Sequence, residues 1–190
     1  MTMEIMAKVA AAQEYRCSAK LRRNFLAGEC HFPLLHLHQS MIRRDYLIVG
    51  AGISGASVCE GIREHDKKGT IMMVGNESFL PYQRPLLFKS YLGKTVPQFA
   101  KLQHHDAQWF EKQKIDLRLD TIVTQFNHER HLAVLGNGQA VEFRKACLAM
   151  GSRARRPQIA GTNLGNVFHL RSIRDVMGLR EIVDLERNAV

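Results

Sequence analysis

The sequence lacks the features that mark several common functional classes. No apolar run approaches the roughly 20 residues that are needed to cross a bilayer, so we expect no membrane partner. The four cysteines form no Cys-x-x-Cys pair, which argues against a zinc ribbon or a thioredoxin-type redox pair and favours a reducing, cytoplasmic location. The net charge of +9 comes without a basic stripe or a nucleic-acid motif, so we expect no DNA or RNA partner.

Residues 1–40 differ in composition from the rest of the chain. They carry a basic patch at residues 20–23 and show no sustained period. A targeting segment would be poor in acidic residues, but three glutamates lie here, so organellar targeting is only weakly indicated. We favour a flexible basic extension, with Met41 as a natural start. Cys30 lies near three histidines, but their spacing matches no standard ligand pattern, and we predict no metal site.

The most informative stretch is residues 45–55, where a short apolar run ends in a Gly-x-Gly-x-x-Gly turn. Gly50 allows the tight turn, Gly52 lets the backbone approach a pyrophosphate, and Gly55 lets the following helix pack closely on the strand. The N-terminus of that helix would supply free N–H groups and a partial positive charge. A strand is expected before the turn and a helix after it, so the pattern predicts a dinucleotide site. Its members are Gly50, Ala51, Gly52, Ile53, Ser54 and Gly55.

The flanking segments fit this interpretation. Residues 46–49 predict a strand that is buried on both faces. Apolar residues then recur at helical spacing and predict a first helix that ends near residues 64–65. A second strand is expected over residues 70–74. Glu77 follows, 22 positions after Gly55, where an acidic residue typically accepts hydrogen bonds from ribose hydroxyls. The alternative is an exposed glutamate in a loop.

A stiff segment bracketed by prolines comes next: Pro81-Tyr82-Gln83-Arg84-Pro85-Leu86-Leu87-Phe88-Lys89. If Pro85 opens a short helix, Pro85 and Lys89 lie on one face. The residues alone indicate two cations, Arg84 and Lys89, in a rigid loop near a phosphate site. A solvated charged loop would have the same spacing.

The rest of the chain predicts further strands and two helices. Strands are expected over residues 115–119, 122–126, 131–135, 140–143, 146–149 and 166–170, and helices over residues 104–113 and 173–185. The Gly136-Asn137-Gly138 turn is a hairpin signal, so we expect a small antiparallel lobe packed on the main sheet. Ser172 and Asp175 have capping-box spacing. Gly151 follows a parallel strand, at the edge where α/β sheets bind ligands.

Together these segments resemble the FAD-dependent pyridine nucleotide oxidoreductases, most of all the ferredoxin reductase, rubredoxin reductase and apoptosis-inducing-factor branch. The resemblance covers residues 45–190. It rests mainly on the Pro-Tyr-x-Arg-Pro-x-Leu-x-Lys segment, supported by Gly75-Asn76-Glu77 and Leu148-Ala149-Met150-Gly151-Ser152. It implies an α/β, glutathione-reductase-like FAD/NAD(P)-binding Rossmann fold, with a parallel sheet, helices and a small antiparallel lobe, present here incompletely. It also implies hydride transfer from NAD(P)H to FAD and electron transfer to a ferredoxin- or rubredoxin-like protein or another acceptor.

The resemblance assigns roles to particular residues. Three glycines of the turn would pass the FAD pyrophosphate, Glu77 would bind the adenosine ribose, Arg84 would hold the ADP half, and Lys89 would approach the flavin ring as the catalytic residue. The other expected FAD-binding residues are Ala51, Ile53, Ser54, Pro85, Ala149 and Gly151. Phe88 and Met150 replace a serine and a threonine that the family usually carries, so two hydroxyls near the flavin are missing.

Length is the largest departure from this family. The composition indicates a flexible basic extension over residues 1–40. The resemblance implies the first segment of an FAD-binding domain over residues 41–186 and the start of an NAD(P)-binding domain over residues 187–190. We therefore interpret the chain as an FAD-binding portion that is not active alone. A truncated or degenerate nucleotide-binding module without catalysis is the main alternative. A small dehydrogenase that binds NAD directly is disfavoured, because no Tyr-x-x-x-Lys pair is evident.

Overall fold

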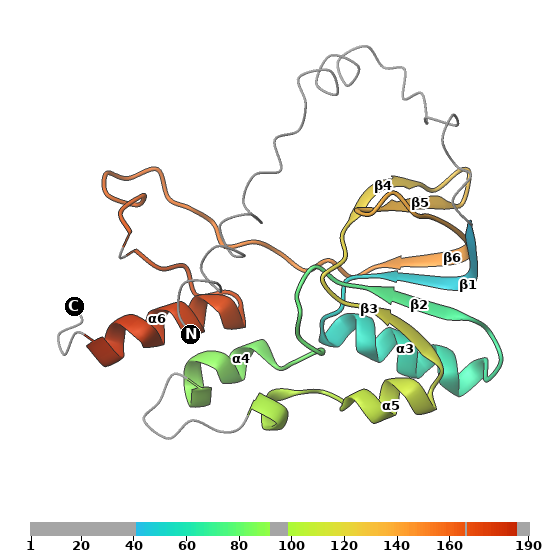
Figure 1. Cartoon of the computed structure of the whole chain (residues 1–190), viewed down its shortest axis with the longest axis horizontal. Coiled ribbons are helices and arrows are strands. Elements are labelled where there is room, and N and C mark those ends of the chain that lie inside the picture. The colour runs from blue at the N-terminus through green and yellow to red at the C-terminus, as the bar shows by residue number, and fades with distance from the viewer. Residues whose placement is uncertain (1–40, 92–98, 166, 186–190) are drawn as a thin grey trace, which may run out of the picture. The chain divides into compact units, whose positions relative to one another are not determined.

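The computed structural model describes residues 41–91, 99–165 and 167–185 (Figure 1). The predicted extension over residues 1–40, with Cys30 and its neighbouring histidines, lies outside the described residues, as do residues 187–190. Among the described helices, none combines the length and the apolar character that a membrane crossing requires.

Strands and helices alternate along the first half of the described chain. The strands are β1 (Ile42–Val49), β2 (Ile71–Val74), β3 (Ile115–Arg118), β4 (Val123–Asn127), β5 (Leu132–Leu135) and β6 (Ala140–Leu148). The α-helices are α3 (Ile53–His65), α4 (Arg84–Leu86), α5 (Ala107–Lys112) and α6 (Ile173–Leu185). A π-helical turn, η3 (Leu87–Tyr91), follows α4, and a 3-10 turn, η4 (Phe99–Leu102), precedes α5.

The six strands form one mixed sheet in the order β3-β2-β1-β6-β5-β4. The first four in this order are parallel, whereas β5 pairs antiparallel with both β6 and β4. In register, Val49 of β1 lies opposite Val74 of β2 and Leu148 of β6. Three parallel strands therefore end side by side, and the glycine turn follows the middle one, β1. This arrangement confirms the predicted α/β fold class.

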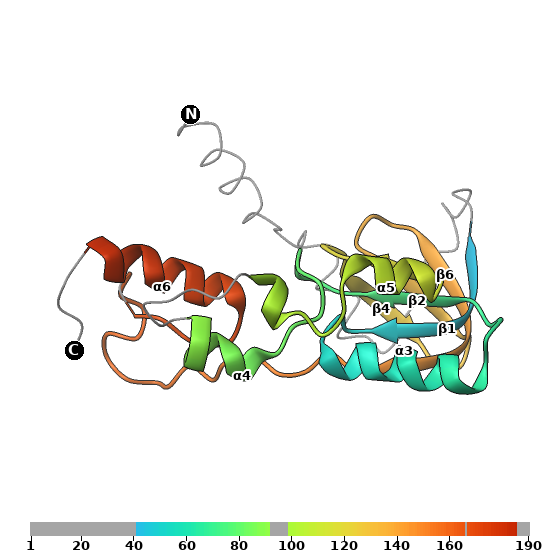
Figure 2. The ribbon, with the colours of Figure 1, turned by 90° about the horizontal axis from the view of Figure 1, so that it is seen from below.

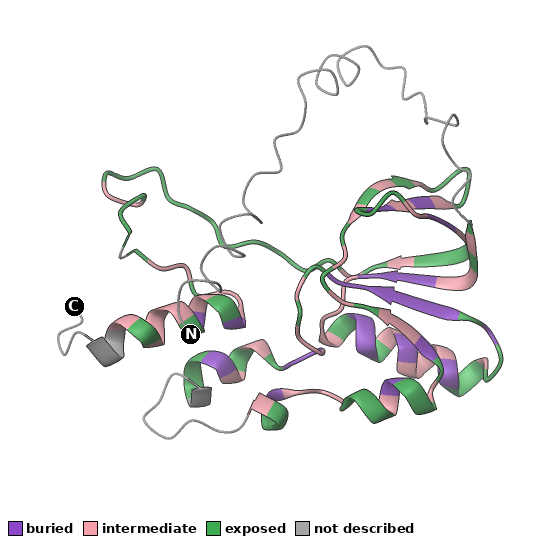
Figure 3. Ribbon diagram, in the orientation of Figure 1, coloured by how far each residue is buried: buried purple, intermediate pink, exposed green. Residues whose placement is uncertain are grey.

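The centre of the sheet is buried on both faces, as the apolar runs of β1 and β2 predict (Figure 3). On one face, Ile48 and Met73 pack with Cys59 of α3 and Phe110 of α5. Both helices lie along this side of the sheet (Figure 2). The other face is covered by apolar side chains of the antiparallel strands. The predicted antiparallel lobe is thus hydrogen-bonded into the main sheet and folds over its second face.

Residues 140–148 form one strand, so the prediction of two strands over residues 140–143 and 146–149 is wrong. Arg144 and Lys145, which lie between the two expected strands, are part of the continuous strand and have exposed side chains. The Arg144 guanidinium lies 5.1 Å from the centre of the Tyr46 ring and donates to its hydroxyl at 2.9 Å. Pairing with β1 on one side and β5 on the other keeps the strand continuous.

The prediction of a strand over residues 166–170 is also wrong. Residues 167–170 have no strand partner in the described part of the chain, and Val167 and Leu170 are both exposed. The Val167 N–H instead donates to the Leu164 carbonyl at 3.2 Å, in a turn. An apolar segment forms a strand only where a neighbouring strand offers free backbone N–H and C=O groups. The local sequence pattern does not show whether such a neighbour is present.

The predicted capping box at the start of α6 is confirmed. The Asp175 carboxylate accepts from the Ser172 N–H at 2.6 Å, and the Ser172 hydroxyl accepts from the Asp175 N–H at 3.4 Å. The same carboxylate also accepts from the Arg171 N–H at 3.0 Å. These bonds occupy N–H groups that the first helical turn leaves unpaired, and they fix where α6 begins.

Candidate functional site

The glycine turn joins the end of β1 to α3, and Gly50 is fixed by the sheet. It has φ +121°, and a Cβ there would lie 2.1 Å from the Ala149 carbonyl oxygen. Its N–H donates to the Val74 carbonyl at 2.7 Å, and the Ala149 N–H donates to the Val49 carbonyl at 2.7 Å. Gly50 therefore lies between the ends of β2 and β6, where only a residue without a side chain fits.

Two further glycines are required by close approach. A Cβ on Gly55 would lie 2.1 Å from the Gly50 carbonyl oxygen, and a Cβ on Gly75 would lie 2.3 Å from the Cβ of Ala51. The first contact lets α3 pack against the turn, as the motif predicts. The second brings the end of β2 against the turn. The glycine turn and the segment that leads to Glu77 are therefore in contact.

Gly52 is different, because no described residue around it requires a glycine there. A Cβ at this position would meet no described atom within 4 Å, and its backbone is extended, with φ −100° and ψ −174°. Gly52 is the N-cap of α3, yet it brings no capping side chain, and the first turn holds no acidic residue. The space above the helix N-terminus is therefore open, which fits a bound pyrophosphate.

The N–H groups of the first turn point toward this open space by the geometry of a helix. The Ala56 N–H is the first to find a helical carbonyl, that of Gly52, at 3.0 Å. Those of Ile53, Ser54 and Gly55 precede it and have no intrahelical partner. They carry the positive end of the helix dipole, which attracts an anion. The residues present thus fit the phosphates of a dinucleotide.

Glu77 and Arg84, to which the resemblance gives separate roles, form an ion pair. Tyr82 joins them: its hydroxyl donates to the Glu77 carboxylate at 2.6 Å and accepts from Arg84 Nη1 at 3.1 Å. Burial, together with the hydrogen bond to Glu77, raises the pKa of Tyr82 to about 12. Sequence reasoning missed this role of Tyr82, although its position inside the proline-bracketed segment was a signal.

The same network reaches the start of α6. Arg84 Nη1 also donates to the Arg171 carbonyl at 3.0 Å, and the Ile173 N–H donates to the Tyr82 hydroxyl at 3.1 Å. The apolar side chains of Tyr82, Leu87 and Ile173 pack together beside these bonds. These contacts anchor the proline-bracketed segment to the start of α6, although Arg84 and Arg171 are 87 positions apart in the sequence.

Replacing Tyr82 with phenylalanine should reduce the free energy of unfolding by about 1–3 kcal/mol at pH 7, because it leaves the buried Ile173 N–H and the partly buried Glu77 and Arg84 without this hydrogen-bond partner. The raised pKa adds a pH dependence: the unfolded tyrosine ionises near 10, before the folded one, so the wild type loses this stabilisation as the pH rises from 10 to 12. Urea unfolding at pH 7, 10 and 11 should show the difference between the two proteins narrowing above pH 10. A constant difference would contradict the assignment.

The remaining predicted site residues lie on two segments. Pro85 is in α4, and Lys89 is in η3, exposed and without an ion pair to any described residue. Ala149 adjoins Gly50, whereas Gly151 has φ +67° and would place a Cβ 3.3 Å from Arg171 Nη2. Ala149 is thus brought to the glycine turn. For Lys89, the described residues show no hydrogen bond or ion pair to that turn.

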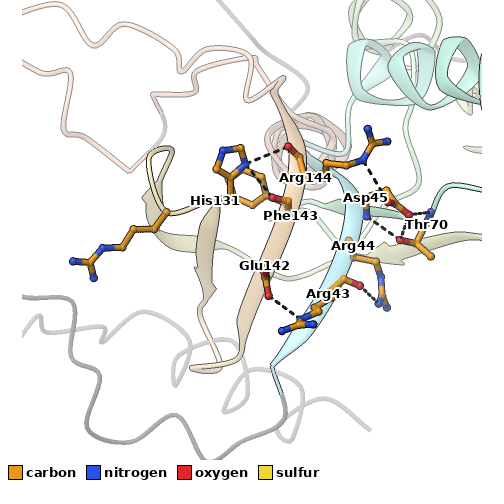
Figure 4. Close-up of a pocket in the computed structure, with 9 residues that line it drawn as sticks. Arg43, Arg44, Asp45, Thr70, His131, Glu142, Phe143 and Arg144 are labelled. Atoms are coloured by element: carbon orange, nitrogen blue, oxygen red, sulfur yellow. Dashed lines mark hydrogen bonds and ion pairs between the residues drawn. The ribbon is translucent and has the colours of Figure 1, made fainter.

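A hollow with a different character lies near the amino end of β1, away from the glycine turn (Figure 4). Its charges are engaged in pairs: Arg43 with Glu142 at 2.9 Å and Arg144 with Asp45 at 3.5 Å. The Asp45 carboxylate also accepts from the Thr70 N–H at 2.8 Å, and these bonds hold its pKa below the usual value. We assign the residues around this hollow a structural role, because their contacts join the amino-terminal ends of β1 and β6 and the residue before β2.

The same pieces recur in known proteins. A 3-phenylpropionate/cinnamic acid dioxygenase ferredoxin–NAD(+) reductase component of Photorhabdus laumondii is 33% identical over 147 residues, covering 77% of this chain and 37% of the relative. A rubredoxin–NAD(+) reductase of Pseudomonas putida is 31% identical over 134 residues, covering 70% of this chain and 34% of the relative. The chain thus spans about a third of the length of these relatives.

Solved structures of two reductases also superpose on this chain. The ferredoxin reductase of a Rhodopseudomonas palustris system superposes with a TM-score of 0.69 at 30% identity, over 74% of this chain and 34% of that one. The reductase in a covalent putidaredoxin reductase–putidaredoxin complex gives a TM-score of 0.67, again at 30% identity and with the same coverage. Residues 44–190 match the sequence profile of the pyridine nucleotide-disulphide oxidoreductases. The chain therefore belongs to the pyridine nucleotide-disulphide oxidoreductase family.

Proposed function

We propose that this chain forms the FAD-binding part of an NAD(P)H-dependent flavoprotein oxidoreductase that passes electrons to a ferredoxin- or rubredoxin-like protein. The observation that carries the proposal is Gly52, a glycine that internal packing does not require and that leaves open space over a helix N-terminus. Relatives named as ferredoxin–NAD(+) and rubredoxin–NAD(+) reductases support the choice of the nicotinamide and of the acceptor class.

The glycine turn would hold the pyrophosphate through backbone groups. Ile53 and Ser54 would offer their free N–H groups, and Ala51 and Gly52 would let the phosphates approach the backbone. No acidic side chain lies in the first turn of α3 to repel the charge. Ala149, at the end of β6, would line the same edge of the sheet.

The ion pair between Glu77 and Arg84 leaves both groups with capacity for a ligand. Each oxygen of the Glu77 carboxylate accepts one bond from the protein and keeps a lone pair for a ribose hydroxyl. Arg84 uses three of its five N–H donors, on Tyr82, Arg171 and Glu77, so two remain for the ADP half. The pair orients both side chains before a ligand arrives.

Lys89 is the residue we propose to act on the flavin ring. Bound FAD would supply the capacity to accept a hydride from a nicotinamide and to release electrons singly to a redox protein. The Lys89 ammonium is exposed and carries no ion pair to described residues, so its charge is available to compensate negative charge at a nearby group. That compensation favours the reduced cofactor.

Lys89→Met tests this role in the full chain loaded with FAD. We expect the midpoint potential of the bound FAD to fall by about 30 mV, equivalent to about 1.4 kcal/mol for a two-electron couple. Lys68→Met, which removes an exposed lysine in the turn after α3, should leave the potential unchanged. Equal potentials in wild type and Lys89→Met would refute the role of Lys89. A wild-type chain that binds no flavin would instead support a degenerate module.

A further inference from the structure

Three metal-ligating side chains converge outside the glycine turn. Glu60 projects from α3, and His104 and His105 lie between η4 and α5. One potential ligand atom from each lies within 4.8 Å of the other two. His105 Nε2 contacts Glu60 Oε1 directly, and His104 Nε2 lies 3.2 Å from the same oxygen. Both imidazole rings therefore face one carboxylate oxygen.

The two histidines are held in position by their surroundings. The His104 N–H donates to the Pro81 carbonyl at 2.7 Å, which fixes the backbone. The His105 ring stacks on Trp109 with 3.9 Å between centroids and 8° between planes. Asp106 caps α5 by accepting from the Trp109 N–H at 2.8 Å, so the stacking partner is itself fixed. Little side-chain freedom remains to be lost when a ligand binds.

His104 Nε2 is buried and has no hydrogen-bond partner in the described part of the chain. Its distance from Glu60 is short, but the alignment of a hydrogen bond is missing. A buried polar atom without a partner requires an explanation, and an ion is one of the few that fit. In the tautomer with the proton on Nδ1, Nε2 presents a lone pair, which a metal ion accepts and a carboxylate oxygen cannot.

We propose that Glu60, His104 and His105 bind a divalent transition-metal ion of the zinc class. Two imidazole nitrogens and one carboxylate oxygen form a donor set that zinc takes, with a fourth position for water. Bonds of about 2.0 Å in a tetrahedron separate ligand atoms by about 3.3 Å, close to the 3.2 Å between His104 Nε2 and Glu60 Oε1. The contact of His105 Nε2 with the same oxygen is shorter than this separation and would have to widen when an ion binds.

The site would serve the structure of the molecule. It joins α3 to the segment directly after η4. Next to this site Gln103 pairs with Tyr82, and the carbonyl of Leu102, the last residue of η4, accepts from the Gln83 N–H at 2.9 Å. A bound ion would therefore fix the segment that carries Tyr82 and Arg84 relative to the helix of the glycine turn. This inference does not depend on whether FAD binds.

Titration of the full chain with Co²⁺, and with Zn²⁺ in competition, tests the proposal. We expect one Co²⁺ per chain at this site, with visible d–d absorption, no thiolate charge-transfer band, and displacement by Zn²⁺. Glu60→Gln and His104→Ala should each weaken Co²⁺ binding by about 100-fold or more, since loss of an outer-shell partner alone costs 10–100-fold. Circular dichroism without metal should show that both variants remain folded.

The histidines and the cysteine near the N-terminus provide the matched control. The full chain carrying Cys30→Ala, His31→Ala, His36→Ala and His38→Ala should keep the Co²⁺ spectrum and its affinity, because the proposal assigns binding to Glu60, His104 and His105. If Co²⁺ binding is lost in that variant but unchanged in Glu60→Gln and His104→Ala, the proposal is overturned. It is equally overturned if the wild-type chain binds no Co²⁺.

Discussion

Replacing Gly52 with valine should remove FAD binding and leave the fold intact. The isopropyl group would occupy the open space over the N-terminus of α3 and block its free N–H groups. Loss of two charge-assisted hydrogen bonds costs about 3 kcal/mol, or a factor of about 100 in affinity. The backbone at Gly52 is extended and a Cβ meets nothing within 4 Å, so the free energy of unfolding should fall by only about 1 kcal/mol or less.

Flavin absorbance and fluorescence titrations measure the affinity, and urea unfolding measures the stability. Gly61→Ala is the matched control, because a Cβ at Gly61 also meets nothing within 4 Å but lies within α3, away from its N-terminus. We expect it to bind FAD as the wild type does. A Gly52→Val protein with wild-type affinity would show that the open space is not the pyrophosphate site.

Gly55→Ala, in contrast, should mainly lower the free energy of unfolding. An added Cβ would lie 2.1 Å from the Gly50 carbonyl oxygen and 3.0 Å from the Met73 methyl carbon. The first contact is with the backbone of Gly50, whose N–H is hydrogen-bonded to Val74 of β2. The added methyl group can therefore be accommodated only if α3 moves. Overpacking of this kind costs about 3 kcal/mol.

Urea denaturation tests this prediction through the transition midpoint, which should fall while the slope stays constant. Gly61→Ala again provides the comparison, since it adds the same methyl group to the same helix and should raise stability slightly through helix propensity. Equal midpoints for wild type and Gly55→Ala would contradict the close packing of α3 on the turn. The variants at Gly52 and Gly55 therefore distinguish a glycine needed for ligand binding from one needed for the packing of α3, within one motif.

Local patterns accounted for the elements around the glycine turn. The buried strands, the first helix and the capping box at Ser172 follow from short-range spacing and side-chain chemistry. β6 did not, because its continuity depends on pairing with β1 and β5 on its two sides. The strand expected over residues 166–170 failed for the converse reason, since no partner strand lies beside it among the described residues.

The candidate site divides in the same way. The glycine turn can be found in the sequence because its members are adjacent. The pairing of Glu77 with Arg84 through Tyr82 requires the loop between them to fold back, which spacing does not show. Arg63 is a further case: it is buried at the end of α3 and donates to the carbonyls of Gln113 and Gly69, at 2.7 and 2.8 Å. No pattern around a lone arginine indicates such partners.

The central claim is that this chain binds FAD at the end of β1. The direct measurement is titration of the purified full chain with FAD, followed by visible absorbance and by the thermal unfolding midpoint. We predict one FAD per chain, a changed flavin spectrum and a higher midpoint, since a ligand that binds only the folded state stabilises it. A flavin spectrum and an unfolding midpoint that both stay unchanged at saturating FAD would contradict the claim.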